Sequence, residues 1–253
     1  MTTPKPFVLL LSLVVIWTGC ATSGPMHLYV AGQGAEPVED RALESGPNDQ
    51  LAGFLEPGDV VVGLGYEFNT DYIWLRLAPG NRLITIKRGF RELWYDYDLP
   101  AEFMLSEGQM GDLAVRSFNR LVYVALAEPG RIGRVERYGK VRESFQPGGV
   151  ARPIGGLAWD QRQDQLVVLY ADAGGEVVFF ENESAPMRRV TFDTPLQPTT
   201  LAYDSNRERF YIPLSGGSAL GEFDREGKLL NRLPWTQPRA AIDAGQRSAV
   251  RMF

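Results

Sequence analysis

The chain has 253 residues, with 26 basic and 31 acidic side chains and a formal net charge of −5. Nucleic-acid binders usually carry a basic domain charge, so this balance argues against nucleic acid as a partner. The single cysteine excludes an intrachain disulfide and a thiolate metal site, and 27 glycines with 17 prolines favour a turn-rich β protein.

The first 20 residues have the pattern of a secretion signal that ends at a cysteine. Lys5 provides a positive start, residues 7–17 form an apolar run interrupted only by Ser12, and small residues lead to Cys20. A bilayer-spanning helix takes about 20 apolar residues, whereas the apolar segment of a signal peptide takes roughly 7–15. The run is therefore too short to remain as a transmembrane helix.

The segment Ile16-Trp17-Thr18-Gly19-Cys20 resembles the lipobox of bacterial lipoproteins, although Trp17 stands where that family usually has leucine. The resemblance implies removal of residues 1–19, a diacylglycerol on Cys20 and acylation of the new amino group, and such multiple chains anchor stably. Ala21 follows the cysteine instead of the aspartate that marks inner-membrane retention, which favours the outer membrane. The alternative is an ordinary signal peptide cut slightly later, which would discard Cys20.

Downstream, one phrase recurs along the chain. An apolar residue, a small residue and an aromatic or β-branched residue, often followed by Asp, precede a polar turn and an apolar strand. The copies begin at Leu64, Leu113, Leu157, Leu201 and, more weakly, Ala240. Periods near 40–50 residues with several strands per unit indicate propeller blades. The small residue lets neighbouring backbones approach near the axis.

Two further features complete the predicted fold. Asp160, Asp204 and Asp243 are expected to begin turns, because a short carboxylate accepts backbone N–H bonds there. A second hairpin follows in each of the first four copies, with turn residues between apolar runs. No stretch shows a sustained 3.6-residue apolar period, so little helix is expected.

The fifth copy has only two strands' worth of chain, with the second at Ala249-Val250. Residues 28–31 and 50–54 are predicted as two early strands that complete this blade, with a loop over residues 33–49. A closed ring leaves no open sheet edge. We therefore expect an all-β propeller over residues 28–253, after a tether at residues 20–27. It has five four-stranded blades closed by N-terminal strands, with six blades as the alternative.

The phrases Leu157-Ala158-Trp159-Asp160 and Phe223-Asp224-Arg225-Glu226-Gly227-Lys228 resemble the YVTN, NHL and gluconolactonase-like group of propellers. The resemblance implies a fold and not an activity. Metal-dependent lactonases of this group hold a divalent cation near an Asn-Gly-Leu-Ala phrase. The corresponding Gly155-Gly156-Leu157-Ala158 and Thr199-Thr200-Leu201-Ala202 lack the asparagine, so no metal or other cofactor is expected.

Nucleophilic catalysis usually relies on a histidine base. His27 is the only histidine, and its place at a turn-to-strand boundary predicts a surface residue. The sequence therefore favours a non-catalytic binding or scaffolding module in the cell envelope, with an envelope protein or glycan as partner. A propeller hydrolase of the metal-dependent lactonase type is the alternative.

Two local features are candidate binding sites. Three aromatic and two acidic side chains stand together in Trp94, Tyr95, Asp96, Tyr97 and Asp98, which suits a sugar or peptide contact, or an outer blade strand with alternating faces.

The second feature is charge. Residues 116–152 hold eight basic and three acidic side chains, while residues 35–60 are strongly acidic. Arg134, Arg137 and Lys140 are expected to be exposed together, facing an anionic glycan, lipid headgroup or acidic protein patch. The alternative is two solvated faces without a partner.

Overall fold

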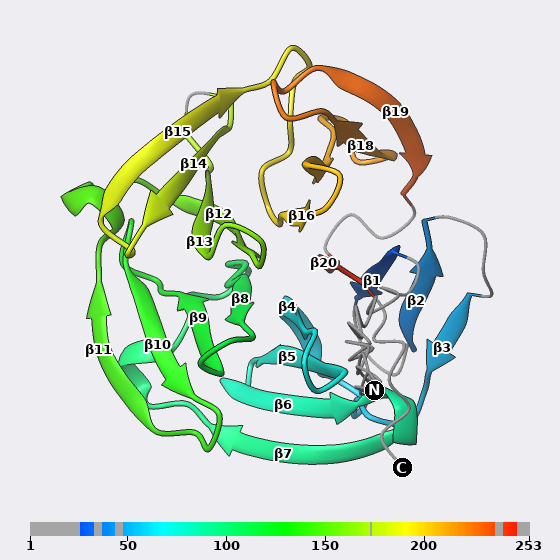
Figure 1. Ribbon diagram of the computed structural model, residues 1–253. Helices are drawn as coiled ribbons and strands as arrows, with labels where there is room; N and C mark the ends of the chain where they lie inside the picture. The colour runs from blue at the N-terminus through cyan, green and yellow to red at the C-terminus, as the bar shows by residue number, and fades with distance from the viewer. Residues whose placement is uncertain (1–25, 33–36, 44–47, 173, 236–239, 247–253) are drawn as a thin grey trace, which may run out of the picture.

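The structure is a computed structural model that describes residues 26–32, 37–43, 48–172, 174–235 and 240–246. Cys20, the predicted signal peptide and the predicted strand at Ala249-Val250 lie outside the described residues. Five four-stranded antiparallel sheets stand around a central axis (Figure 1). The predicted all-β propeller with five blades is confirmed.

Blades 1 and 2 follow each other along the chain. Blade 1 consists of β4 (Val60–Glu67), β5 (Tyr72–Ala78), β6 (Arg82–Lys87) and β7 (Glu92–Asp98). Blade 2 consists of β8 (Leu113–Arg116), β9 (Leu121–Ala125), β10 (Ile132–Glu136) and β11 (Val141–Phe145). In each blade the first strand lies nearest the axis and the last lies at the periphery (Figure 1).

Blades 3 and 4 repeat this order. Blade 3 consists of β12 (Ile154–Asp160), β13 (Gln165–Tyr170), β14 (Glu176–Glu181) and β15 (Ala185–Thr191). Blade 4 consists of β16 (Ala202–Asp204), β17 (Arg209–Pro213), β18 (Ala219–Phe223) and β19 (Leu229–Pro234). The helical elements of the described chain are three short 3-10 segments, η1 (Arg88–Phe90), η2 (Ala101–Phe103) and η3 (Pro147–Gly149). None of the described helices is long and apolar enough to cross a membrane.

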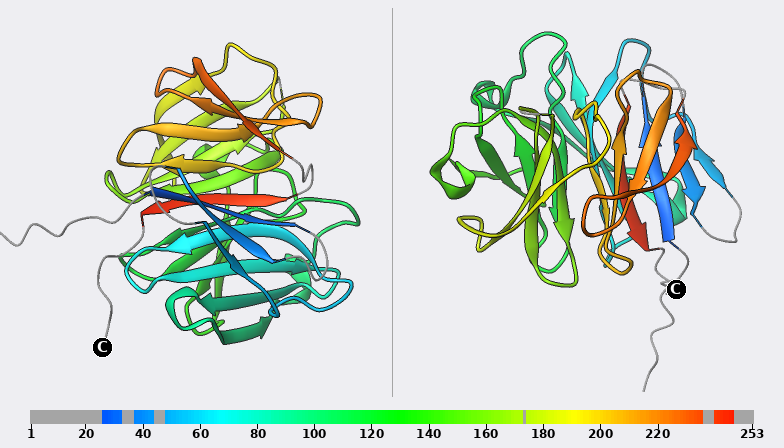
Figure 2. Two further views of the ribbon diagram at one scale, coloured as in Figure 1. Left: turned by 90° about the vertical axis from the view of Figure 1, so that its right-hand side faces the viewer. Right: turned by 90° about the horizontal axis from the view of Figure 1, so that it is seen from above.

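Blade 5 joins the two ends of the chain. Its strands, from the axis outward, are β20 (Ala241–Gln246), β1 (Met26–Ala31), β2 (Val38–Ala42) and β3 (Asp49–Leu51). β1 pairs with β20 along its whole length, and the two strands lie side by side in Figure 2. In the described part of the chain, three early strands and one late strand close the ring, whereas the sequence predicted two early strands; the second predicted late strand lies outside the described residues.

The loop predicted over residues 33–49 is wrong in part, because β2 lies within it. Val38 and Asp40 of this strand are fully buried. Asp40 belongs to an acidic stretch that resembles a solvated loop in the sequence, but its carboxylate pairs with the His27 imidazole of β1. His27 is itself fully buried, so the prediction of a surface histidine is wrong.

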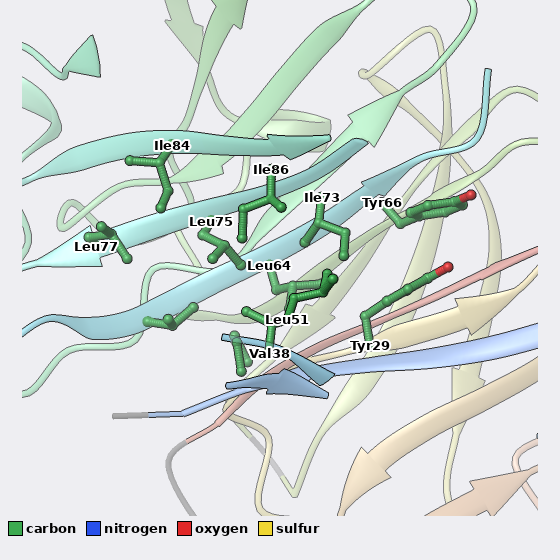
Figure 3. Packing of buried hydrophobic residues seen from close by; sticks show 13 residues of the cluster. Tyr29, Val38, Leu51, Leu64, Tyr66, Ile73, Leu75, Leu77, Ile84 and Ile86 are labelled. Carbon is green, nitrogen blue, oxygen red and sulfur yellow. The ribbon is translucent and has the colours of Figure 1, made fainter. Parts of the chain in front are cut away.

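Neighbouring blades pack face to face through alternate residues of each inner strand. Leu157 and Trp159 of β12 face blade 2, while Ala158 faces blade 4. A similar cluster joins blades 5 and 1, where Tyr29 lies beside Tyr66 (Figure 3). The small residues are required by this close approach, since a Cβ on Gly65 would lie 2.4 Å from the Leu113 side chain. This packing brings the ends of the five inner strands together around the axis.

Candidate functional site

At one end of the axis, the ends of the inner strands surround a cavity of about 420 Å³, here called the axial mouth. All five blades contribute to its lining. Its aromatic side chains are Tyr66, Phe68, Phe118, Trp159 and Tyr203. Amides and hydroxyls supply most of its polar groups, Arg162 is its basic residue and Asp243 is its acidic residue.

A chain of hydrogen bonds fixes the rim of the mouth. The backbone N–H of Phe68 donates to Ser117 Oγ at 3.1 Å, and that of Ser117 to Gln161 Oε1 at 3.3 Å. The N–H of Gln161 in turn donates to Ser205 Oγ at 3.0 Å. These residues occupy the same position in four successive repeats, each following the phrase that begins with leucine. The shared position of these residues in the repeats was the available sequence signal for the rim.

Aromatic rings form the apolar part of the wall. Trp159 and Tyr203 occupy equivalent positions and are both buried, as their position in the repeats predicts. The Trp159 ring stacks on Tyr123 of blade 2 at a centroid distance of 4.9 Å. Phe118 stands at the rim and is 85% exposed. The mouth thus offers one exposed aromatic ring to a ligand, and several rings that are held by packing.

Asp243 provides the carboxyl group of the mouth lining. Its Oδ2 accepts a hydrogen bond from the Tyr66 N–H at 2.7 Å, and its Oδ1 accepts one from the Ala244 N–H at 2.8 Å. Burial raises the pKa of Asp243 to about 8, although these two hydrogen bonds oppose the rise. Burial therefore favours the protonated, uncharged form of this carboxyl group.

The prediction that Asp243 begins a turn is wrong. Asp160 and Asp204 do begin turns, and each accepts two backbone N–H bonds from the following residues. Asp243 instead lies inside β20 and bonds to blade 1. The fifth repeat aligns two residues later than its sequence suggests, so Ile242 takes the place of Leu201 and Asp243 the place of the small residue.

A second buried carboxyl group, that of Asp112, links the inner strands of neighbouring blades. Asp112 Oδ2 accepts hydrogen bonds from the N–H groups of Leu157 at 3.0 Å and Leu201 at 3.1 Å, and from the Thr200 hydroxyl at 3.2 Å. Thr200 Oγ1 accepts the N–H of Ile242 at 3.1 Å. The inner strands of blades 2 to 5 are thereby tied together by two side chains.

Burial is also the main cause that raises the pKa of Asp112 well above its usual value, and the nearby Asp243 adds to the rise. The hydrogen bonds from Leu157 and Leu201 oppose it. In the other repeats the residue before the leucine is Gly63, Gly156 or Thr200. An aspartate at a position that holds glycine or threonine in the other repeats was therefore the sequence feature that could have identified this buried carboxyl group.

The buried histidine belongs to a separate network between blades 5 and 1. His27 Nδ1 pairs with Asp40, whose Oδ2 lies 3.6 Å from Arg88 Nη1. Arg88 also makes two hydrogen bonds to the Asp71 carboxylate at 2.7 and 2.8 Å. His27 is not among the residues that line the mouth. This network joins blades and places no histidine base in the cavity.

The predicted aromatic and acidic set lies on β7, the outermost strand of blade 1. Its faces alternate: Trp94 is exposed, whereas the Tyr95 and Tyr97 rings stack on each other at 5.5 Å and are partly covered. Asp96 and Asp98 face solvent, and Asp96 pairs with Arg82 at 2.7 Å. None of these residues lines the axial mouth.

The predicted basic set is only partly exposed. Arg137 is 8% exposed, and its guanidinium lies 4.8 Å from the centroid of the Tyr72 ring. The expectation that it is exposed together with Arg134 and Lys140 is therefore wrong. Arg134 pairs with Glu183 at 3.0 Å, while Lys140 is exposed. The structure brings Arg137 beside the β7 aromatics, because Tyr97 donates its hydroxyl hydrogen bond to the Arg137 carbonyl at 2.7 Å.

Within the described residues, no group of three or more His, Cys, Asp or Glu side chains is arranged to hold a metal ion. Hard cations take six or more oxygen ligands. Asp243 is the one acidic residue in the mouth lining, and both of its oxygens accept backbone N–H bonds.

No family model and no curated protein matches this chain. Among solved structures, a nidogen/laminin complex contains a chain with a TM-score of 0.59 and 11% identity, over 87% of this chain and 98% of that one. Virginiamycin B lyase from Staphylococcus aureus has a TM-score of 0.48 and 16% identity, over 79% of this chain and 63% of the lyase. At such low identity, the first similarity shows the propeller fold alone.

Proposed function

We propose that this protein is a non-catalytic binding module, anchored in the bacterial cell envelope through a lipid on Cys20, and that its ligand binds in the axial mouth. The observation that carries the proposal is the axial mouth, a cavity to which all five blades contribute and which is lined by aromatic rings, amides and hydroxyls. Outer-membrane placement follows from Ala21 and belongs to the same proposal.

The chemistry of the lining favours an uncharged, polar ligand. Aromatic faces cover apolar patches of a ligand, while amides and hydroxyls both donate and accept hydrogen bonds. Burial raises the pKa of the Asp243 carboxyl group to about 8, which favours its uncharged form. An envelope glycan combines apolar ring faces with many hydroxyl groups, and we take it as the ligand class.

A non-catalytic role is supported by the state of the candidate catalytic groups. His27 lies between blades, and the oxygens of Asp243 are occupied by backbone N–H groups. The metal-dependent lactonase remains the alternative function. Stoichiometric calcium or zinc in the purified protein, together with a melting temperature that falls on chelation, would favour that alternative.

The mouth is tested by ligand-induced stabilisation. Soluble fragments of envelope glycan are expected to raise the melting temperature, because a ligand at 100 times its Kd stabilises the folded state by about 2.7 kcal/mol. Phe118→Ala should weaken this response by about tenfold in Kd, because Phe118 lines the mouth. Tyr138→Ala is the matched control, since Tyr138 is similarly exposed but does not line the mouth. Equal loss in both variants, or no response in the wild type, would refute the assignment.

The anchor is tested by metabolic labelling. Labelled palmitate is expected to enter the wild-type protein and to be absent from Cys20→Ala, because Cys20 is the only thiol in the chain. Density-gradient fractionation of the labelled cells should place the protein with the outer membrane. Labelling that persists in the variant would show that the lipid is attached elsewhere.

A further inference from the structure

The axial mouth belongs to a larger surface made by two rings of loops. The inner loops follow the inner strands, and the outer loops connect the third and fourth strands of a blade. Because neighbouring strands are antiparallel, both kinds of loop lie at the same strand ends. In blades 1 to 4 they are residues 68–71, 88–91, 117–120, 137–140, 161–164, 182–184, 205–208 and 224–228.

Contacts between inner and outer loops confirm that they share this side, here called the mouth side. Arg88 of an outer loop binds Asp71 of an inner loop, and Arg225 pairs with Glu208 at 3.3 Å. In blade 2, a shallow pocket of about 240 Å³ is lined by both Arg120 and Tyr138. The eight loops therefore form one continuous side of the ring.

Exposed aromatic rings gather on the mouth side. The described aromatic side chains with at least 60% exposure are Phe90, Phe118 and Tyr138, at 60%, 85% and 70%, and all three lie on these loops. Lys87 lies over the Phe90 ring at 4.1 Å and over the Trp94 ring at 4.8 Å. Exposed apolar groups next to cations are typical of surfaces that lie in the headgroup region of a bilayer.

Charge separates the two sides of the ring. The eight mouth-side loops carry nine basic and six acidic residues. The basic ones are Arg88, Arg91, Arg120, Arg137, Lys140, Arg162, Arg207, Arg225 and Lys228. The described loops at the other strand ends carry two basic residues and eight acidic ones, including Glu56, Asp59, Glu102, Glu107 and Glu128. An anionic surface therefore attracts the mouth side and repels the other side.

The chain enters the ring at this same side. β1 begins at Met26, which itself lines the axial mouth. Cys20 precedes Met26 by six positions, and six residues reach at most about 20 Å when fully extended. A lipid on Cys20 would therefore hold the bilayer within about 20 Å of the mouth side.

We propose that the mouth side rests on the surface of an anionic phospholipid bilayer, with Phe90, Phe118 and Tyr138 in the headgroup region. The proposal uses the anchor of the proposed function for its geometry, but the loops supply an attraction of their own. In this orientation the axial mouth faces the bilayer, so its ligand is one that lies at the membrane surface. The acidic side of the ring faces away from the bilayer.

The test uses residues 21–253, which contain every described strand and no cysteine. A single cysteine is introduced by Phe118→Cys on the mouth side or by Met104→Cys on the other side, where Met104 is 54% exposed. Each is labelled with an environment-sensitive fluorophore and mixed with vesicles of phosphatidylcholine, with or without phosphatidylglycerol. We expect a blue shift and brightening only for Phe118→Cys, only with phosphatidylglycerol, and reversed by salt.

A variant series measures the contribution of the rings. The triple change Phe90→Ser, Phe118→Ser and Tyr138→Ser should weaken vesicle binding at least tenfold, while Met104→Ser with Val150→Ser, exposed on the other side, should leave it unchanged. Melting temperatures identify any variant that fails to fold. Equal signals from the two labelled sites, or no vesicle binding by the wild type, would overturn the proposal. Because this chain has no lipid, that failure would leave the palmitate test of the anchor unaffected.

Discussion

Trp159→Ala is expected to lower the free energy of unfolding by about 3–5 kcal/mol, the usual cost of truncating a buried large aromatic residue. Trp159 is 6% exposed and stacks on Tyr123 of the neighbouring blade at 4.9 Å. Its Nε1–H donates to Asp164 Oδ1 at 3.2 Å, and the Arg116 guanidinium lies 5.1 Å from its ring. Alanine removes all of these contacts and leaves a cavity at the boundary between blades 2 and 3.

For a domain of this size, each kcal/mol shifts the melting temperature by about 2–4 °C, so a fall of roughly 6–20 °C is expected. Phe118→Ala is the matched control, because this exposed ring on the mouth rim should change stability by less than about 0.5 kcal/mol. Thermal melts followed by circular dichroism compare the two. An unchanged melting temperature in Trp159→Ala would contradict the burial of this repeat position.

Asp112→Ala is expected to lower the free energy of unfolding by about 2–5 kcal/mol. It removes the acceptor shared by the N–H groups of Leu157 and Leu201, and each buried donor left without a partner costs about 1–3 kcal/mol. Asp112→Asn should cost much less, because its amide oxygen can accept the same bonds while its NH₂ group takes the place of Oδ1. Chemical denaturation of the two variants measures the difference.

The pH dependence of Asp112→Asn gives a separate readout. The pKa of Asp112 is raised in the folded protein, so above about pH 4 the folded state keeps a proton that the unfolded chain releases. Folding therefore takes up a proton, and the free energy of unfolding of the wild type falls as pH rises towards the folded-state pKa. The asparagine variant lacks this loss, so its stability relative to the wild type should increase from pH 5 to pH 8. A stability difference that stays constant from pH 5 to pH 8 would show that Asp112 is already ionised in the folded protein.

The repeat pattern was sufficient to predict the fold. Buried inner strands must carry apolar residues on both faces and small residues near the axis, and both requirements are visible at Leu157-Ala158 and Leu201-Ala202. The same spacing correctly placed Trp159 and Tyr203 between blades. These properties depend on local periodicity, which a single sequence displays directly.

The candidate site was not predictable in the same way. Its lining comes from segments as distant as Met26 and Gly245, and only closure of the ring by β1 and β20 brings them together. The alignment of the fifth repeat failed because Ala240-Ala241-Ile242-Asp243 matches the phrase in a register that differs by two residues from the one in the structure. The hydrogen bond from Ile242 to Thr200 identifies the correct one.

The sequence by itself determined the period and the small residues at the axis in the first four repeats, because both follow from the packing of neighbouring strands. It left five and six blades open, and closure of the ring by β1 and β20 gives five. Only the tertiary structure decided which polar residues are buried. Asp40, Asp112 and Arg137 resemble solvated residues in the sequence, yet each finds its partner on another strand or blade. A buried polar group needs a partner that replaces the interaction it loses with water. The position of that partner is set only when the ring closes.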